Sequence, residues 1–180
     1  MNYSVVKIPV QPITKKYYEK RFASKMDERG YMHLDKKSTF GMKIIHYLDN
    51  WYPSWEIPVV ESPFLKVRLP KVYMNYGIHK SKLLELSKLL DAEAMDFYIQ
   101  EIACAASFPT VSVTDAIITV MAKYDVSEED YRSDSMRRQY DRYCGDILGE
   151  PFKEFSHKIN AAVKALTERM VSKIQKPVHV

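Results

Sequence analysis

The residues best suited to a chemical role are arginines that follow an acidic turn in the last third of the chain. The sequence predicts a helix there that begins at Ser133 or Asp134. Its inner face would carry Met136, Tyr140, Tyr143 and Ile147. With that face fixed, helical geometry points Arg138 and Arg142 outward together. Two guanidinium groups one turn apart on an exposed face are suited to binding phosphates or guanine edges.

The elements before this helix have the order of a helix-turn-helix. A first helix is predicted after Ser112 or Thr114, either of which can cap it. Its apolar residues Val113, Ile117, Val120, Met121 and Tyr124 share one face, while Asp115, Thr119 and Lys123 face away. A turn follows over 124–126, with Val126 pointing inward, and residues 127–130 (SEED) predict the capped start of a short acidic helix. This order can present the next helix to a DNA groove.

The same stretch resembles a known family, the C-terminal DNA-binding domain of the bacterial initiator DnaA, and more broadly Trp-repressor-like modules. The matching residues are Ile117, Val120, Tyr124, Val126, Ser127, Asp130, Tyr131, Ser133 and Arg137. The resemblance covers about 30 residues, 113–143, and implies a DNA-binding helix-turn-helix. The predicted DNA-binding residues are Lys123, Arg132, Ser133, Ser135, Arg137, Arg138 and Arg142.

The chain also departs from the initiator family. After Arg142 it has no Asp-His-Thr-Thr-like signature, and its five glycines form no phosphate-binding loop. The expected function is therefore that of a DNA-binding regulator, or of an accessory factor in replication or transposition, and not of an initiator. The alternative is a non-enzymatic interaction or assembly protein, for example a virion-associated one, in which the helices pack against protein partners.

Charge is distributed unevenly along the chain, although the net charge is only +4. Residues 1–43 contain ten Lys and Arg against four acids, residues 81–130 three against ten, and residues 131–180 ten against six. A polyanion such as double-stranded DNA would therefore meet the N-terminal segment or the last third, and the middle would repel it. The alternative is that these are ordinary solvated faces.

Hydropathy predicts a protein of the cytoplasm that does not bind a membrane. The longest apolar stretches are too short for a bilayer span, and the first ten residues lack the pattern of a secretory signal. A short chain rich in Lys and Tyr suits a phage or mobile-element protein, which would place it in the host cytoplasm.

Periodicity predicts a mainly α fold with a small β element. In the mixed N-terminal part, 1–79, strands are expected over 3–10 and 64–70, which could pair, with helices from Thr14 to about Lys25 and from Ser38 or Thr39 onward. The segment 51–64 has three prolines and two tryptophans, Trp51 and Trp55, and predicts an irregular connection. Those rings would either pin the loop to the core or contact a partner.

The remaining part, 80–180, is predicted to be helical. Residues 81–107 are apolar on more than one face and indicate a central buried helix, with a break near Asp91. A long helix over 151–175 carries an apolar stripe. Its members are Phe152, Phe155, Ile159, Val163, Leu166, Met170 and Ile174. Such a stripe either packs within the monomer or forms a homodimer.

The sequence indicates no catalytic residue, no metal site and no cofactor. Cys104 and Cys144 are widely spaced in helical patterns and are expected to be small buried residues. The five histidines show no ligand spacing. Glu93 and Asp96 are the nearest approach to a carboxylate pair, and an exposed polar edge is the preferred explanation.

Overall fold

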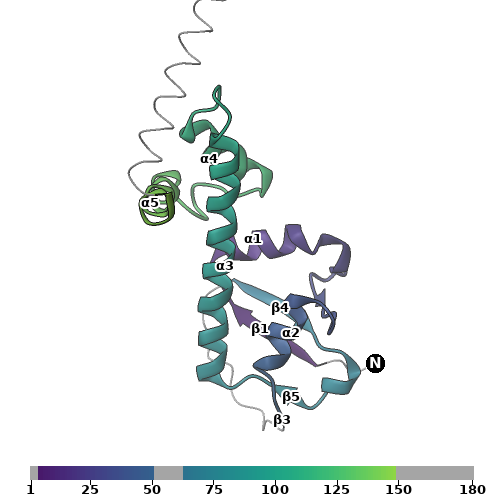
Figure 1. Ribbon diagram of the computed structural model, residues 1–180. Helices are drawn as coiled ribbons and strands as arrows, with labels where there is room; N and C mark the ends of the chain where they lie inside the picture. The colour runs from purple at the N-terminus through teal and green to yellow at the C-terminus, as the bar shows by residue number, and fades with distance from the viewer. Residues whose placement is uncertain (1–3, 51–62, 149–180) are drawn as a thin grey trace, which may run out of the picture. The chain divides into compact units, whose positions relative to one another are not determined.

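The computed structural model describes residues 4–50 and 63–148 (Figure 1). They form the predicted mainly α fold with a small β element. The first elements are β1 (Val5–Pro9), α1 (Pro12–Arg21), the 3-10 helix η1 (Ala23–Lys25), β2 (Met32–His33), α2 (Thr39–His46) and β3 (Asp49–Asn50). They are followed by β4 (Phe64–Arg68), the 3-10 helix η2 (Lys71–Tyr73), β5 (Tyr76–Gly77), α3 (Lys80–Ala106), α4 (Val113–Lys123), α5 (Ser133–Tyr143) and the π-helix η3 (Cys144–Leu148).

The predicted pairing between the first strand and the FLKVRLP segment is confirmed. β1 pairs antiparallel with β4, and β4 pairs parallel with β2, so the strand order is β1-β4-β2. Val6 lies opposite Val67 and Ile8 opposite Leu65, and all four side chains are buried. Because side chains alternate along a strand, the residues between them lie on the other face of the sheet. A second, two-stranded sheet joins β3 to β5.

Helix α1 begins before the predicted cap at Thr14. It starts at Pro12, whose fixed φ and missing N–H suit the first turn of a helix. Thr14 therefore lies inside the helix, where it is buried and cannot cap it. The helix ends at Arg21, short of the predicted Lys25, and η1 follows.

Helix α2 begins as predicted, with Ser38 at its N-cap. The Ser38 hydroxyl accepts a hydrogen bond from the backbone N–H of Gly41 at 3.0 Å and donates one to the carbonyl of Asp35 at 2.8 Å. This close turn leaves no room at position 41, where a Cβ would overlap the Asp35 carbonyl oxygen. Gly41 is thus needed for its small size.

We expect Gly41→Ala to lower the free energy of unfolding by about 1–3 kcal/mol, the usual cost of overpacking. The obstacle is backbone, which a side-chain rotation cannot relieve. Urea titration measures the loss. Gly145→Ala is the matched control, because an added Cβ there meets no atom within 4 Å. Equal stability of the two variants would contradict the prediction.

Helix α3 is continuous, so the predicted break near Asp91 is wrong. The Asp91 carboxylate caps no second segment and instead accepts a hydrogen bond from the backbone N–H of Gln11 at 3.0 Å. The helix is also less uniformly buried than its composition suggested. Its fully buried residues recur every four positions, at Leu86, Leu90, Ala94, Tyr98 and Ile102. Leu84 and Leu89, on other sides of the helix, are 49% and 40% exposed.

A cluster of tyrosines fills the core between α1 and the C-terminal half of α3. The rings of Tyr17, Tyr18 and Tyr98 are almost completely buried, and Tyr124 is nearly so. The centroid of Tyr98 lies 5.1 Å from that of Tyr124 and 6.0 Å from that of Tyr17. The Tyr98 hydroxyl donates a hydrogen bond to the carbonyl of Ile13 at 3.2 Å. Burial raises the pKa of Tyr98, so this hydroxyl stays protonated and remains a donor.

The chain divides into two compact units. Unit 1 comprises Met1–Tyr98 and Met121–Tyr131, and unit 2 comprises Ile99–Val120 and the chain from Arg132 onward. Helices α3 and α4 each contribute to both units, because the division falls within each of them, and the boundary predicted at residue 80 stays a prediction. In the described part of unit 2 the buried apolar residues are Ile99, Ile102, Ala116, Ile117, Val120, Met136 and Cys144.

The two cysteines differ in burial. Cys144 is buried as predicted, whereas Cys104 is exposed and that prediction is wrong. Cys104 follows the buried Ile102 by two positions, which turns its side chain to the opposite side of α3.

Two predicted segments, the helix over 151–175 and the connection with Trp51 and Trp55, fall outside the described residues. Within the described residues, none of the helices is long and apolar enough to cross a bilayer.

Candidate nucleic-acid interface

Helix α5 has the inner face that the sequence predicted. It begins at Ser133, preceded by Arg132 in an extended conformation. Met136 is completely buried, and Tyr140 and Tyr143 are half-buried. The side chain of Ile147, the fourth predicted member, is not among those described. Asp134 in the first turn and Arg142 in the last both have the sign that the helix dipole favours.

The arginines of α5 fall into two groups. Arg137 is engaged within the helix, since its Nε donates to the two carboxylate oxygens of Asp141 at 3.2 and 3.3 Å. Arg138 is exposed and its Nε donates to the carbonyl of Asp134 at 3.3 Å, which leaves its terminal nitrogens available. The side chains of Arg132 and Arg142 are exposed, and neither guanidinium group forms a hydrogen bond or ion pair with another described residue. Three guanidinium groups of this helix can therefore meet a ligand.

The other predicted DNA-binding residues lie as follows. Ser133 and Ser135, in the first turn of α5, are half-buried. Lys123 ends α4 and is exposed, with its Nζ 5.3 Å from the centroid of the Tyr124 ring. Lys123 belongs to unit 1 and the α5 residues to unit 2. Six of the seven predicted DNA-binding residues thus lie on α5 or directly before it, and the seventh, Lys123, lies in the other unit.

Helix α4 matches its prediction closely. Ser112 caps it, because its hydroxyl accepts a hydrogen bond from the backbone N–H of Asp115 at 3.1 Å. The predicted inner residues Ile117, Val120, Met121 and Tyr124 are buried and Val113 is half-buried. The predicted outer residues Asp115, Thr119 and Lys123 are exposed.

The turn after α4 is a C-cap with one residue in the left-handed region. Asp125 has a φ of 55°, and the backbone N–H of Val126 donates to the carbonyl of Met121 at 2.9 Å. Asp is among the few residues besides glycine that adopt this conformation readily. Val126 is buried, as predicted. The chain thus reverses within unit 1 without a glycine.

Residues 127–130 form a capping arrangement but not the predicted short helix. The backbone N–H of Ser127 donates to the Asp130 carboxylate at 2.8 Å, and the N–H of Asp130 donates to the Ser127 hydroxyl at 3.3 Å. The segment then closes as a turn before α5 begins. The Asp130 carboxylate also forms an ion pair with a cation from α1.

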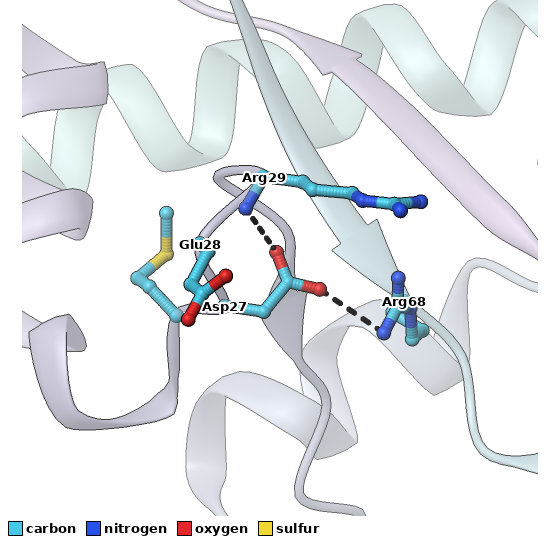
Figure 2. Close-up of a pocket in the computed structure, with 5 residues that line it drawn as sticks. Asp27, Glu28, Arg29 and Arg68 are labelled. Atoms are coloured by element: carbon cyan, nitrogen blue, oxygen red, sulfur yellow. Dashed lines mark hydrogen bonds and ion pairs between the residues drawn. The ribbon is translucent and has the colours of Figure 1, made fainter.

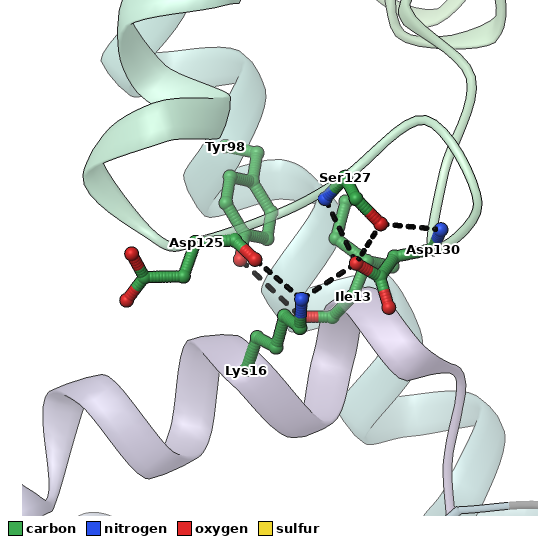
Figure 3. A network of polar contacts seen from close by, with 6 residues as sticks. All are labelled: Ile13, Lys16, Tyr98, Asp125, Ser127 and Asp130. Carbon is green, nitrogen blue, oxygen red and sulfur yellow. Dashed lines mark hydrogen bonds and ion pairs between the residues drawn. The ribbon is translucent and has the colours of Figure 1, made fainter.

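Lys16 is that cation, and Figure 3 shows its position under the turn. Its Nζ donates to the Asp130 carboxylate at 2.6 Å and to the backbone carbonyl of Asp125. The hydrogen bond from Lys16, together with those from Ser127, lowers the pKa of Asp130 to about 2. Lys20 lies 3.6 Å from the Asp125 carboxylate. Two of the turn's four acids are therefore paired with cations within unit 1, Asp130 closely and Asp125 weakly, which reduces the repulsion that this acidic stretch would otherwise exert on a polyanion.

The two members of the possible carboxylate pair on α3 lie in different surroundings. Glu93 accepts hydrogen bonds from the Lys43 ammonium at 2.5 Å and from the Tyr18 hydroxyl at 3.2 Å, whereas Asp96 is exposed. Glu93 thus ties α2 and α1 to α3. Among the described residues no three His, Cys, Asp or Glu side chains are grouped so that they could hold a metal ion.

A surface hollow of about 480 Å³ went unnoticed in the sequence. It is lined by Met26, Asp27, Glu28, Arg29 and Arg68 (Figure 2). Asp27 accepts hydrogen bonds from the backbone N–H groups of Tyr31 and Arg29, and its carboxylate lies 3.0 Å from Arg68 Nη1. These interactions, the one from Tyr31 first, lower the pKa of Asp27. Arg68 lies beside the Asp27 loop because of the strand register, so no local sequence pattern predicts this hollow.

No family model, curated protein or solved structure matches this chain. Its function must therefore be inferred from the side chains themselves.

Proposed function

We propose that this protein binds double-stranded DNA through α5, as a regulator or an accessory factor in replication or transposition. The observation that supports this most directly is the exposure of Arg132, Arg138 and Arg142, whose guanidinium groups form no core contact and no ion pair with another residue of the described ranges 4–50 and 63–148. Arg138 and Arg142 are four residues apart and lie on one side of the helix, away from the buried Met136. Guanidinium groups so placed bind phosphates or the O6 and N7 edge of guanine.

We expect Arg138→Ala combined with Arg142→Ala to weaken binding to mixed-sequence duplex DNA. Each lost phosphate contact should flatten the log–log salt dependence by about 0.9, so the pair should change it by about two units. Stability should change by no more than about 0.5 kcal/mol, since both side chains are exposed. Fluorescence anisotropy over a salt series measures both the affinity and the slope.

The matched control is Lys80→Ala combined with Lys88→Ala. It removes the same charge from two exposed positions of α3. If the wild-type protein shows no binding to duplex DNA near 50 mM salt, where sequence-independent binding usually persists, the proposal is wrong. The same holds if the control lowers the affinity as much as the α5 variant does.

The alternative proposal is an interaction or assembly protein, and exposed apolar side chains in unit 2 favour it. Ile118 on the outer side of α4 is 57% exposed, and Phe108 before α4 is 60% exposed. In that case Arg138 and Arg142 should pair with acidic residues of a neighbouring protein. The predicted homodimer through 151–175 belongs to the same alternative and rests on the apolar stripe of the sequence.

A further inference from the structure

The outward face of the three-stranded sheet in unit 1 carries bases and aromatic rings. Its residues alternate with the buried ones, and they include Lys7 on β1, Phe64, Lys66 and Arg68 on β4, and His33 on β2. Lys7 and His33 are exposed, and Phe64, Lys66 and Arg68 are half-buried. None of the three strands contains an acidic residue.

Two lysines of this face lie directly opposite each other. Lys7 pairs with Lys66 in the β1–β4 register, which places their Cβ atoms about 5 Å apart. Like charges in this position destabilise a sheet. A lysine on an edge strand such as β1 can protect against strand addition, but this role does not explain Arg68, which is paired with both β1 and β2, and it leaves the repulsion between Lys7 and Lys66 in place. An anionic ligand would offset their repulsion.

An aromatic ring stands among these cations. The centroid of the Tyr31 ring is 5.6 Å from Lys66 Nζ and 5.1 Å from the guanidinium carbon of Arg68. These contacts, with the Asp27–Arg68 ion pair, hold the cationic side chains in place over the face. Phe64 supplies a second ring at the end of β4. Arg29 lies at the edge, in the hollow beside Arg68 (Figure 2).

We propose that this face binds a strand of single-stranded nucleic acid. Lysines along adjacent strands can follow the phosphates, and aromatic rings at a protein surface stack with bases only when these are unpaired. A flat sheet face does not enter the groove of a duplex as a helix does. The proposal does not rest on the role of α5, because all of these residues belong to unit 1 and none belongs to that helix.

The test is binding of fluorescein-labelled oligo-dT of 15 nucleotides to the full chain. We expect Lys7→Ala combined with Lys66→Ala to reduce the log–log salt slope by about 1.4, at about 0.7 per single-strand phosphate contact, and the affinity at 0.1 M salt by about 25-fold. Lys80→Ala with Lys88→Ala is again the charge-matched control and should leave both unchanged. Arg138→Ala with Arg142→Ala should also leave oligo-dT binding unchanged, so this proposal and the α5 proposal can fail separately.

Phe64→Leu distinguishes base stacking from attraction by charge alone. It keeps an apolar side chain but removes the ring, so we expect about a fivefold loss of affinity with no change in salt slope. Phe64→Tyr keeps the ring, should bind like the wild type, and controls for misfolding. The proposal is overturned if the wild type does not bind oligo-dT at 50 mM salt, or if the Lys7 and Lys66 variant binds as tightly as the α3 control. The proposal is also overturned, in favour of an acidic protein partner, if a poly-glutamate peptide binds as tightly as oligo-dT and Phe64→Leu has no effect on either affinity.

Discussion

Replacement of Tyr98 by alanine is expected to lower the free energy of unfolding by about 3–5 kcal/mol, the usual cost of removing a large buried ring. The side chain is completely buried and lies in contact range of the rings of Tyr17 and Tyr124. Its loss would leave a cavity between α1 and α3 within unit 1 and would remove the hydrogen bond to Ile13. Urea or thermal unfolding of the full chain measures the loss.

The control is Tyr98→Phe, which keeps the ring and removes only the hydroxyl. We expect it to cost about 1 kcal/mol, the net value of one hydrogen bond. A Tyr98→Ala variant that loses no more stability than Tyr98→Phe would show that the ring does not hold this core together.

Local patterns predicted the elements whose stability is itself local. The caps at Ser38 and Ser112 and the inner face of α4 each depend on residues within one or two turns, and the structure confirms them. The start of α1 was misplaced because Thr14 and Pro12 both signal a helix N-terminus, and the proline is the stronger signal where its missing N–H costs nothing. Two partners that lie far away in the sequence were missed.

Asp91 and Lys16 show why those partners were missed. Asp91 reads as a cap because its residue type favours that role, but Gln11, 80 positions earlier, supplies the N–H that it accepts. Lys16 carries no local signal of a partner, yet it binds the turn 109 and 114 positions later. Neither the partner nor the distance can be derived from periodicity, which describes only neighbours along one element.

The two candidate binding surfaces also differ in how far the sequence alone predicts them. The exposed arginines of α5 follow from helical geometry once Met136 is assigned to the core, so a single segment of sequence is enough to predict them. The basic sheet face requires the register, because Lys7 and Lys66 are 59 positions apart and only the β1–β4 pairing places them side by side. The alternation in VVKIP and FLKVR was the available signal, and it shows which residues share a face but not which strands are neighbours.

Stability is expected to fall as the pH drops from about 4 to about 2, in part because of Asp130. Its pKa is about 2 in the folded protein against an ordinary value of 3.8, so the unfolded chain binds the proton more readily. The stabilisation is therefore fully present above the unfolded pKa and is lost as the pH falls through the folded one. A difference of this size corresponds to about 2 kcal/mol. Asp27, Asp35 and Asp49 also have lowered pKa values and should contribute to the same acid dependence.

Asp130→Asn should isolate the part that belongs to Asp130. The variant cannot form the ion pair with Lys16, and we expect it to lose about 2 kcal/mol at pH 7 and to show a shallower decline between pH 4 and pH 2. Asp125→Asn is the matched control in the same turn. Its carboxylate is 80% exposed and pairs only weakly with Lys20, and asparagine adopts the same left-handed conformation, so its stability should stay close to that of the wild type at every pH. Urea unfolding at intervals between pH 2 and pH 7 measures all three proteins. Parallel curves for Asp130→Asn and the wild type would show that the Lys16–Asp130 contact does not stabilise the turn, because the proton linkage would then be absent.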